Sequence, residues 1–251
     1  WDEVSLDKDL GAECVLGTGY QSSHHIKKDI FDWDYKIFPV GTFDIITASP
    51  VCLWWSCLRN TWIGRKLKGM TRPLTKEDIQ KDIDTYGKPM VDKVREIIDY
   101  FQPKFYWIEN PSTGKMKEYI TDLPFYDVDY CKYTTWGYKK RTRFWTNIEG
   151  FQPKKCSKKF GLCKNIIVSD KGQTLHKHRM GTSKTVVDDV TGKIIRVNSA
   201  TLRKKYKHKK DVSLDYGGGN NRYERYRIPK ILIRELFNAT GLELNRDSIS
   251  I

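Results

Sequence analysis

The sequence predicts an α/β protein with a doubly wound, mainly parallel sheet and a smaller, basic, loop-rich lobe. Over residues 1–150, short β-like runs alternate with helical patterns, which is typical of parallel strands covered by helices. Past Gly150 the pattern weakens into short segments separated by glycines, and the excess positive charge lies in that part of the chain. These observations define the fold class before any single residue is considered.

The predicted elements follow in chain order. Residues 4–6, 43–48 and 105–108 are predicted strands, each a short apolar run. Between the second and third strands, apolar residues recur at three- and four-residue spacings, which predicts helices interrupted near Gly87-Lys88-Pro89. A strand, a helix and a parallel strand form a right-handed crossover unit, and ligands bind outside the carboxyl ends of such strands.

The remaining elements complete the predicted domain organisation. Residues 125–131 and 143–146 are predicted to pair as antiparallel strands at one edge of the sheet. Residues 228–237 form an amphipathic pattern with a proline near its start, which predicts a C-terminal helix. The predicted division has three parts, namely a main domain over 1–150, a basic lobe over 151–222 and a returning helix within 223–251.

The positive charge is concentrated in one segment. The 251 residues carry 45 lysines and arginines against 31 acidic residues, a formal net charge of +14. Residues 151–210 hold 17 of the basic residues and three of the acidic ones, so they account for the entire excess. This concentration favours binding of a polyanion, with nucleic acid preferred over an acidic membrane surface. A solvated lysine-rich face is the simpler alternative for the segment, and a localisation signal is the alternative for residues 203–210.

Cysteine content and hydropathy indicate the compartment. Six cysteines in a chain of this length are too few for a disulfide scaffold and fit a reducing environment. The sequence contains no long apolar run, and its start at Trp1-Asp2-Glu3 lacks the pattern of a signal peptide. We therefore expect an intracellular protein without a membrane span.

Cys52 lies in the stretch SPVCLWWS, directly after the second predicted strand. A lone cysteine beside tryptophans is usually an inert core residue. A nucleophile is the other interpretation, because Glu109 follows the next strand and the cations of residues 139–143 favour a thiolate. Since the carboxyl ends of parallel strands meet at one edge of a sheet, Cys52 and Glu109 are expected to lie close together.

Three motifs occur in an order that resembles one family. Ser49-Pro50-Val51-Cys52 comes first, Glu109-Asn110-Pro111 second and Arg141-Thr142-Arg143 third. In this order and at this approximate spacing they resemble the DNA (cytosine-5) methyltransferases, especially the compact forms of phages and large DNA viruses. The resemblance is clearest over residues 1–150. It implies a Rossmann-like methyltransferase sheet, with the basic segment as the target-recognition lobe.

The resemblance implies catalytic roles for four residues. The Cys52 thiolate would add to carbon 6 of cytosine and so activate carbon 5. Glu109 would hydrogen-bond ring nitrogen 3 and offset the charge that develops on the ring. Arg141 and Arg143 would hold the carbonyl oxygen of the base and its phosphate. The base must leave the stacked duplex for this chemistry.

The resemblance also implies a cofactor and a partner. S-adenosylmethionine would contact Asp7 through its ribose, Asp29 and Ile30 through its adenine, and the loop at Pro50, although ordinary solvated carboxylates are the alternative for both aspartates. The partner would be double-stranded DNA, bound by a monomer. The residues expected to contact DNA are Ser56, Asn110, Lys139, Arg203, Lys204 and Lys205.

Some positions depart from the family pattern. Lys139 stands where the family prefers glutamine, Val51 replaces a second proline, and Trp54-Trp55 adds bulk beside the thiol. A glycine-rich cofactor loop is expected before Asp7, and the sequence begins without one. The alternative function is therefore a catalytically inactive DNA-binding homologue. An enzyme acting on free cytidine nucleotides is disfavoured, because such a small substrate does not require a basic lobe.

One group of residues has the chemistry of metal ligands, namely Cys156, Cys163, His176 and His178. Six residues separate the two cysteines and one residue separates the two histidines, and both spacings match common zinc sites poorly. We therefore assign these residues to the target-recognition lobe and assign no residue to a metal, with zinc binding as the less favoured alternative.

Overall fold

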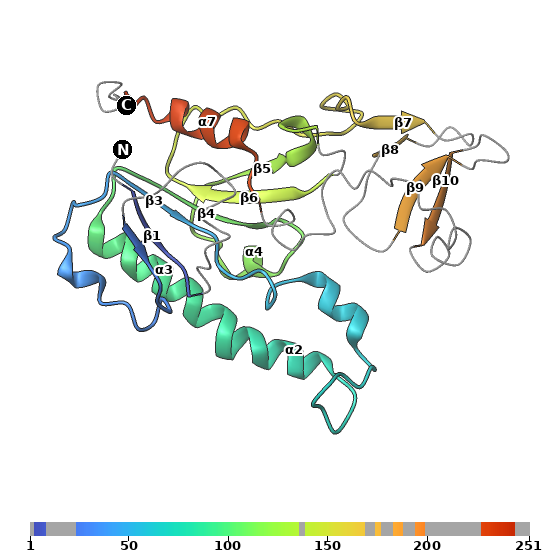
Figure 1. Ribbon diagram of the computed structural model, residues 1–251, viewed down its shortest axis with the longest axis horizontal. Coiled ribbons are helices and arrows are strands. Elements are labelled where there is room, and N and C mark those ends of the chain that lie inside the picture. The colour runs from blue at the N-terminus through green and yellow to red at the C-terminus, as the bar shows by residue number, and fades with distance from the viewer. Residues whose placement is uncertain are drawn as a thin grey trace. The chain divides into compact units, whose positions relative to one another are not determined.

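The computed structural model describes residues 3–8, 24–135, 139–168, 174–176, 183–187, 194–198 and 227–243 (Figure 1). The chain divides into two compact units. The first unit contains residues 1–110, 114–123 and 240–251, and the second contains residues 111–113 and 124–239. The three-part division expected from the sequence stays a prediction.

The first unit contains the predicted strand–helix–strand motif. Strand β3 (Ile45–Ala48) pairs in parallel with β4 (Phe105–Pro111), so that Ile45 lies opposite Phe105 and Ala48 opposite Ile108. The connection runs through α2 (Lys76–Asp82), the π-helical turn η3 (Ile83–Gly87) and α3 (Lys88–Phe101). The short elements of this unit are η1 (Tyr35–Ile37), η2 (Cys57–Trp62) and α4 (Met116–Tyr119). The parallel pairing predicted for residues 43–48 and 105–108 is confirmed.

The helical connection differs from its prediction at one point. Its expected break near Gly87 is a single π-helical turn that joins α2 to α3 without a gap. Pro89 lies in the first turn of α3, directly after the π-helical turn, and has no N–H to donate to the preceding turn. The helix ends where Gln102 adopts the left-handed conformation at φ 47° and donates its N–H to the carbonyl of Ile98.

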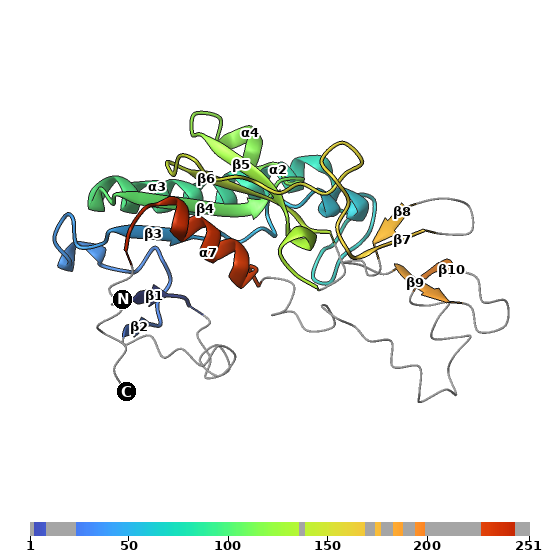
Figure 2. The same cartoon turned by 90° about the horizontal axis from the view of Figure 1, so that it is seen from above.

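The core of the first unit forms where α3 covers β3 (Figure 1; Figure 2). Ile97 and Phe101 of α3 are buried together with Tyr35, and Phe43 and Ile46 pack against them. The rings of Phe43 and Phe101 meet edge to face with their centroids 4.8 Å apart. Buried residues recur along one side of α3 at the spacings of an amphipathic helix, namely Val91, Val94, Ile97, Ile98 and Phe101.

A second pair of parallel strands lies near the start of the chain. Strand β1 (Val4–Leu6) pairs with β2 (His24–Ile26), with Leu6 opposite Ile26. Beyond the pair, the Asp7 N–H donates to the Ile26 carbonyl at 3.2 Å. The strand at residues 4–6 is confirmed, whereas β2 was not predicted, because the three residues His24, His25 and Ile26 show no hydrophobic period.

The second unit is built on antiparallel pairs. Strand β5 (Phe125–Asp129) pairs with β6 (Arg141–Thr146), as predicted, and the 3₁₀ turn η4 (Tyr130–Lys132) follows β5. Strands β7 (Ile166–Val168) and β8 (Thr174–His176) form one hairpin, and β9 (Ser183–Val187) and β10 (Ile194–Asn198) form another. The C-terminal helix α7 (Lys230–Ala239) buries Leu232 and Leu236, and its Glu235 pairs with Lys154.

The described residues therefore form a mixed α/β protein with both parallel and antiparallel strands. The doubly wound strand order expected from the sequence stays a prediction. No described helix combines the length and the apolar character needed to cross a bilayer.

The start of α2 gives a direct test of local stability. The Thr75 hydroxyl accepts the Asp78 N–H at 3.2 Å, and the Asp78 carboxylate accepts the Thr75 N–H at 2.9 Å, which makes a reciprocal capping box. We expect Thr75→Ala to lower the free energy of unfolding by about 1 kcal/mol, measured by urea denaturation. Thr75→Ser keeps the hydroxyl and should cost less than half as much. Equal losses in both variants would contradict the capping role.

Candidate active site

The loop that carries Cys52 is held against the end of β4. The Asn110 side-chain Nδ2 donates to the Pro50 carbonyl at 2.8 Å, and Asn110 is 1% exposed. Cys52 follows Pro50 by two residues, and Glu109 directly precedes Asn110. The parallel pairing of β3 and β4 and this single hydrogen bond therefore bring the thiol loop and the Glu109 strand end to one edge of the sheet.

Two tryptophans anchor the thiol loop from the other side. Trp55 is 2% exposed, its ring stacks on Tyr119 with centroids 5.8 Å apart, and its carbonyl accepts the Lys115 N–H at 2.8 Å. Trp54 stacks on Tyr86 at 4.9 Å. The bulk that departs from the family pattern is thus used to fix the loop, and Cys52 itself is only half-buried. Partial exposure is what a nucleophile needs and an inert core cysteine lacks.

The loop ends at Ser56, a residue expected to contact DNA. Ser56 is the N-cap of η2, and its hydroxyl accepts the Leu58 N–H at 3.3 Å. Behind η2, the buried Arg59 pairs with Asp82 of α2 and its guanidinium lies 5.5 Å from the Trp54 ring centroid. Ser56 therefore has a local structural role in ending the loop.

Glu109 and Asn110 lie within β4 and are nearly inaccessible. Glu109 is 6% exposed and follows the fully buried Ile108. The Oδ1 atom of Asn110 is buried and has no hydrogen-bond partner among the described residues. A buried polar atom without a partner is uncommon, and here it belongs to the residue that directly follows Glu109 in β4.

The two arginines of the third motif are engaged in cross-strand ion pairs. Arg141 contacts Asp129 through Nε and Nη2 at 2.9 and 2.8 Å, and Arg143 contacts Asp127 in the same way at 2.8 and 3.0 Å. The Arg143 guanidinium also lies 3.5 Å from the ring centroid of Phe125. Antiparallel pairing places each arginine directly opposite its aspartate, so the pairs follow from the register.

The two arginines differ in exposure. The Arg141 side chain is 38% exposed and that of Arg143 is 14% exposed. The carbonyl of Arg141 accepts the N–H of Ser112, which follows Glu109-Asn110-Pro111 in the chain. The third motif is therefore in contact with the segment that continues directly from the second.

Asp129 is the centre of the polar contacts on β5. Its side chain is fully buried and lies near Lys139 Nζ at 3.4 Å, while its Oδ2 accepts the Cys156 N–H at 2.7 Å. Burial alone would raise the pKa of Asp129, but Arg141, the Cys156 N–H and Lys139 together hold that pKa below its ordinary value. Lys139, expected to contact DNA, also donates to the Cys156 carbonyl at 2.7 Å.

Three of the four residues expected to bind the cofactor, Asp7, Asp29 and Ile30, follow the strands of the first pair, whereas Pro50 lies in the loop after β3. Asp7 follows the end of β1, and Asp29 follows β2 by three residues, so both carboxylates come after the carboxyl ends of parallel strands. The Asp29 carboxylate accepts the Phe31 N–H at 3.1 Å and lies 3.9 Å from Lys8 Nζ. Ile30 packs against the core formed by Tyr35, Ile97 and Phe101. Carboxylates at the carboxyl ends of parallel strands are suited to bind the ribose hydroxyls of a nucleotide-like cofactor, and Asp7 and Asp29 have this position.

Three expected DNA contacts, Arg203, Lys204 and Lys205, lie outside the described residues, as does His178 of the metal group. The other three members of that group do come together. The side chains of Cys156, Cys163 and His176 meet, and Cys131 joins them. Burial, followed by the neighbouring thiols, raises the pKa of Cys131, and burial also raises the pKa of Cys163.

Sequence reasoning missed Cys131, Asp127 and Asp129. The aspartates had a readable signal, because an Asp-x-Asp strand and an Arg-x-Arg strand place opposite charges on matching faces when they pair. Cys131 had no such signal, because 24 residues separate it from Cys156.

One comparison with known proteins gives a clear match. The chain is 47% identical over 150 residues to a probable DNA (cytosine-5)-methyltransferase of Frog virus 3 (isolate Goorha). The matched residues make up 59% of this chain and 66% of that relative, slightly less than two thirds of its length. No family model matches the chain. The identity nevertheless confirms that the chain resembles the viral DNA (cytosine-5) methyltransferase family.

Proposed function

We propose that this protein transfers a methyl group from S-adenosylmethionine to carbon 5 of a cytosine in double-stranded DNA. The observation that carries the proposal is the hydrogen bond from Asn110 to the Pro50 carbonyl, which holds the Cys52 loop beside the strand end that bears Glu109. Similarity to the probable DNA (cytosine-5)-methyltransferase of Frog virus 3 supports the same activity. The chemistry requires a thiol, a carboxyl group and a site that an extruded base can enter.

The proposed reaction begins with the Cys52 thiolate. Its sulfur adds to carbon 6 of the ring, and a sulfur–carbon bond forms while the electrons of the 5,6 double bond move toward carbon 5. The Glu109 side chain acts as a carboxylic acid, donates a hydrogen bond to ring nitrogen 3 and so offsets the negative charge of the adduct. Carbon 5 then takes the methyl group that the cofactor supplies. Loss of the carbon 5 proton to a base restores the double bond and expels the Cys52 thiolate.

Arg141 is the better placed arginine for contact with the base or its phosphate. Its side chain is more exposed than that of Arg143, and Asp129 fixes the orientation of its guanidinium through two hydrogen bonds. Arg143 is enclosed by Asp127 and Phe125, so we assign it a structural role in holding β6 against β5. An orienting carboxylate lowers the conformational freedom that a guanidinium loses on binding.

Duplex DNA is the proposed partner because of the charge distribution. Residues 151–210 carry the whole net charge of +14, and a lobe of that charge attracts the phosphate backbone independently of sequence. Asp7 and Asp29 are proposed to hold the ribose and adenine of S-adenosylmethionine, because both follow the carboxyl ends of parallel strands. Ile30 contributes an apolar surface beside them.

A trapping experiment tests the nucleophile. The chain is incubated with S-adenosylmethionine and duplex DNA that contains 5-fluorocytosine, because fluorine at carbon 5 prevents release of the enzyme after methylation. We expect a covalent adduct at Cys52, detected on a denaturing gel and mapped by mass spectrometry. Cys52→Ala should form no adduct and lose at least 1000-fold in methylation, on the order of the loss of a covalent nucleophile.

Cys57→Ala is the matched control for this experiment. Cys57 lies five residues further along the chain and is more exposed than Cys52, so it tests whether any accessible thiol reacts. We expect it to keep adduct formation and turnover, and both variants should bind duplex DNA with the affinity of the parent chain. Methylation by Cys52→Ala, or an adduct at Cys57, would overturn the proposed mechanism.

The support of the thiol loop gives a second prediction. A Cβ on Gly87 would lie 3.0 Å from Cε2 and Cζ2 of the buried Trp55 ring and 3.4 Å from the Trp54 Cβ. Because the Gly87 φ of −70° suits alanine, helix propensity alone would favour Gly87→Ala by about 1 kcal/mol. We expect the crowding to dominate, displace the loop and reduce the methylation rate roughly tenfold, with a lower melting temperature.

A double variant separates crowding from other effects of this substitution. Trp55→Phe shortens the ring at the point of contact, so Gly87→Ala combined with Trp55→Phe should lose less than the two single losses added together. Methylation kinetics and thermal melts of the four proteins form the cycle. Additive losses, or full activity in Gly87→Ala, would show that the contact does not position the loop.

A further inference from the structure

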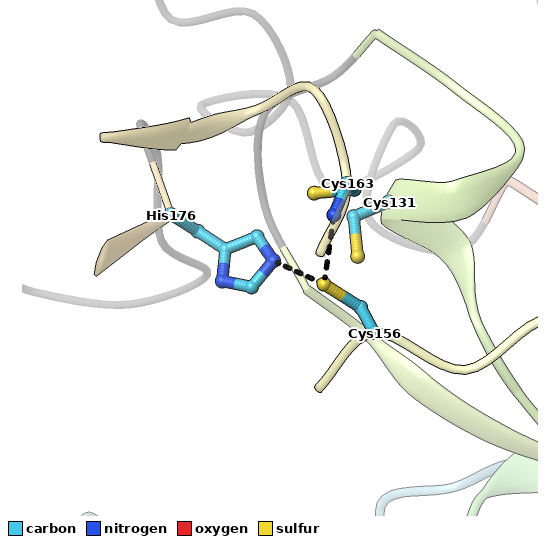
Figure 3. A group of neighbouring side chains, drawn as sticks. All are labelled: Cys131, Cys156, Cys163 and His176. Atoms are coloured by element: carbon cyan, nitrogen blue, oxygen red, sulfur yellow. Dashed lines mark hydrogen bonds between the residues drawn. The ribbon is translucent and has the colours of Figure 1, made fainter. Parts of the chain in front are cut away.

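Three buried thiols and one imidazole meet in the second unit, apart from the proposed catalytic residues. The four ligand atoms of Cys131, Cys156, Cys163 and His176 all lie within 4.8 Å of one another (Figure 3). The three cysteines are 3%, 2% and 9% exposed. Figure 3 shows the four side chains gathered in one place, with the imidazole facing Cys156 through Nε2 at 3.5 Å.

We propose that Cys131, Cys156, Cys163 and His176 bind a structural zinc ion. Three cysteines and one histidine form one of the ligand sets of closed zinc sites, which use four protein ligands and keep no position for a substrate. Tetrahedral bonds of about 2.3 Å to sulfur and about 2.0 Å to nitrogen place a sulfur and a nitrogen ligand about 3.5 Å apart. The spacing of Cys156 Sγ and His176 Nε2 has this value.

The local backbone explains how an unusual cysteine spacing becomes compatible with metal binding. Between Cys156 and Cys163 the chain turns back on itself, since the Phe160 N–H donates to the Ser157 carbonyl at 3.2 Å and Gly161 adopts a φ of +82°. A β-bridge between Ser157 and Gly161 closes the loop. The turn brings the Cys163 N–H within 3.3 Å of Cys156 Sγ. An N–H directed at sulfur is the type of contact that stabilises a metal-bound thiolate.

The other two ligands come from neighbouring elements. His176 ends β8, and the antiparallel register places it opposite Ile166, whose side chain packs on the three cysteines. Cys131 lies in η4, directly after β5, and its carbonyl accepts the Asn165 side-chain N–H at 3.5 Å. The hydrogen bond between Asp129 and the Cys156 N–H holds the two cysteine segments together. The four ligands therefore come from separate segments of the chain, which a structural metal ion would connect.

The surrounding charge also fits a metal–thiolate centre. Zinc with three thiolates and a neutral imidazole carries one net negative charge. Lys139 Nζ donates to the Cys156 carbonyl at 2.7 Å, and Lys132 Nζ donates to the Leu162 carbonyl at 3.3 Å, so two ammonium groups lie beside the ligand loop. A disulfide would use only two of the sulfur atoms and would leave the third thiol and the imidazole without a bond.

The site would fix the β7–β8 hairpin to the end of β5. The hairpin lies inside the basic segment of residues 151–210, so the zinc ion would give that segment a rigid point of attachment. The position of the site, away from Cys52 in the chain and closed to substrate, assigns it to structure and not to methyl transfer.

Metal content is the decisive measurement, because it does not depend on catalysis. The full chain is purified without a metal-affinity tag, equilibrated with a weak chelator and analysed by inductively coupled plasma mass spectrometry. We expect about one zinc per chain, as a closed four-ligand site requires. After exchange with Co²⁺, the protein should show the visible ligand-field bands and the thiolate charge-transfer absorption of a tetrahedral thiolate site.

Matched serine variants locate the metal. Cys156→Ser and Cys163→Ser remove ligands and should lose at least tenfold in retained zinc, whereas Cys57→Ser removes an exposed cysteine outside the cluster and should keep it. His176→Ala removes the nitrogen ligand, so a folded variant that still binds Co²⁺ should show a shifted Co²⁺ spectrum. Parent protein without retained zinc and without a tetrahedral Co²⁺ spectrum would overturn the proposal. A disulfide among the three cysteines, or zinc retained equally in Cys156→Ser, would also overturn it.

Discussion

The hydrogen bond between the Asn110 side chain and the Pro50 carbonyl joins the two loops on which the proposed chemistry depends. Parallel pairing of β3 and β4 brings the strand ends to one edge, but pairing stops at Ala48 opposite Ile108 and does not fix the chain beyond. Loss of this bond would leave the carbonyl of the buried Pro50 without this partner, at a cost of about 1–3 kcal/mol. The conformation of the Cys52 loop is therefore tied to the residue next to Glu109.

The helical connection between β3 and β4 supports the Cys52 loop on the side away from Asn110. Trp54 and Trp55 pack the loop against the helical connection. Gly87 has no side chain, so the Trp55 ring can approach the helix backbone there. The π-helical turn falls at the same place, and such turns are frequent where a helix must accommodate a functional constraint. The thiol loop thus lies between a hydrogen bond on its strand side and an aromatic contact on its helix side. Two independent restraints of this kind limit the motion of the loop while Cys52, the proposed nucleophile, stays half-buried.

Asp129 links the two functional proposals within the second unit. Its carboxylate accepts two hydrogen bonds from Arg141, which is proposed to contact the base, and it also accepts the N–H of Cys156, a proposed zinc ligand. A fully buried carboxylate is tolerated there because a guanidinium, an ammonium and a backbone N–H surround it. The arrangement lets one side chain connect the catalytic edge of β6 to the start of the basic segment. Changes at the metal centre would therefore reach the orientation of Arg141 through a single residue.

The sequence by itself determined the parallel strand–helix–strand unit, the antiparallel β5–β6 pair and the C-terminal helix, because each has a hydrophobic period or a proline that local physics can interpret. It also determined the order of the Cys52, Glu109 and Arg141 motifs, and hence the family resemblance. Only the tertiary structure decided that Cys131 joins Cys156, Cys163 and His176, and that each motif arginine has an aspartate opposite it. Those contacts depend on strand register and on a turn at Gly161, which bring together residues that are distant in the chain. Local periodicity carries no information about such distances, so a spacing that looks unsuitable for zinc in the sequence becomes a four-ligand site in the fold.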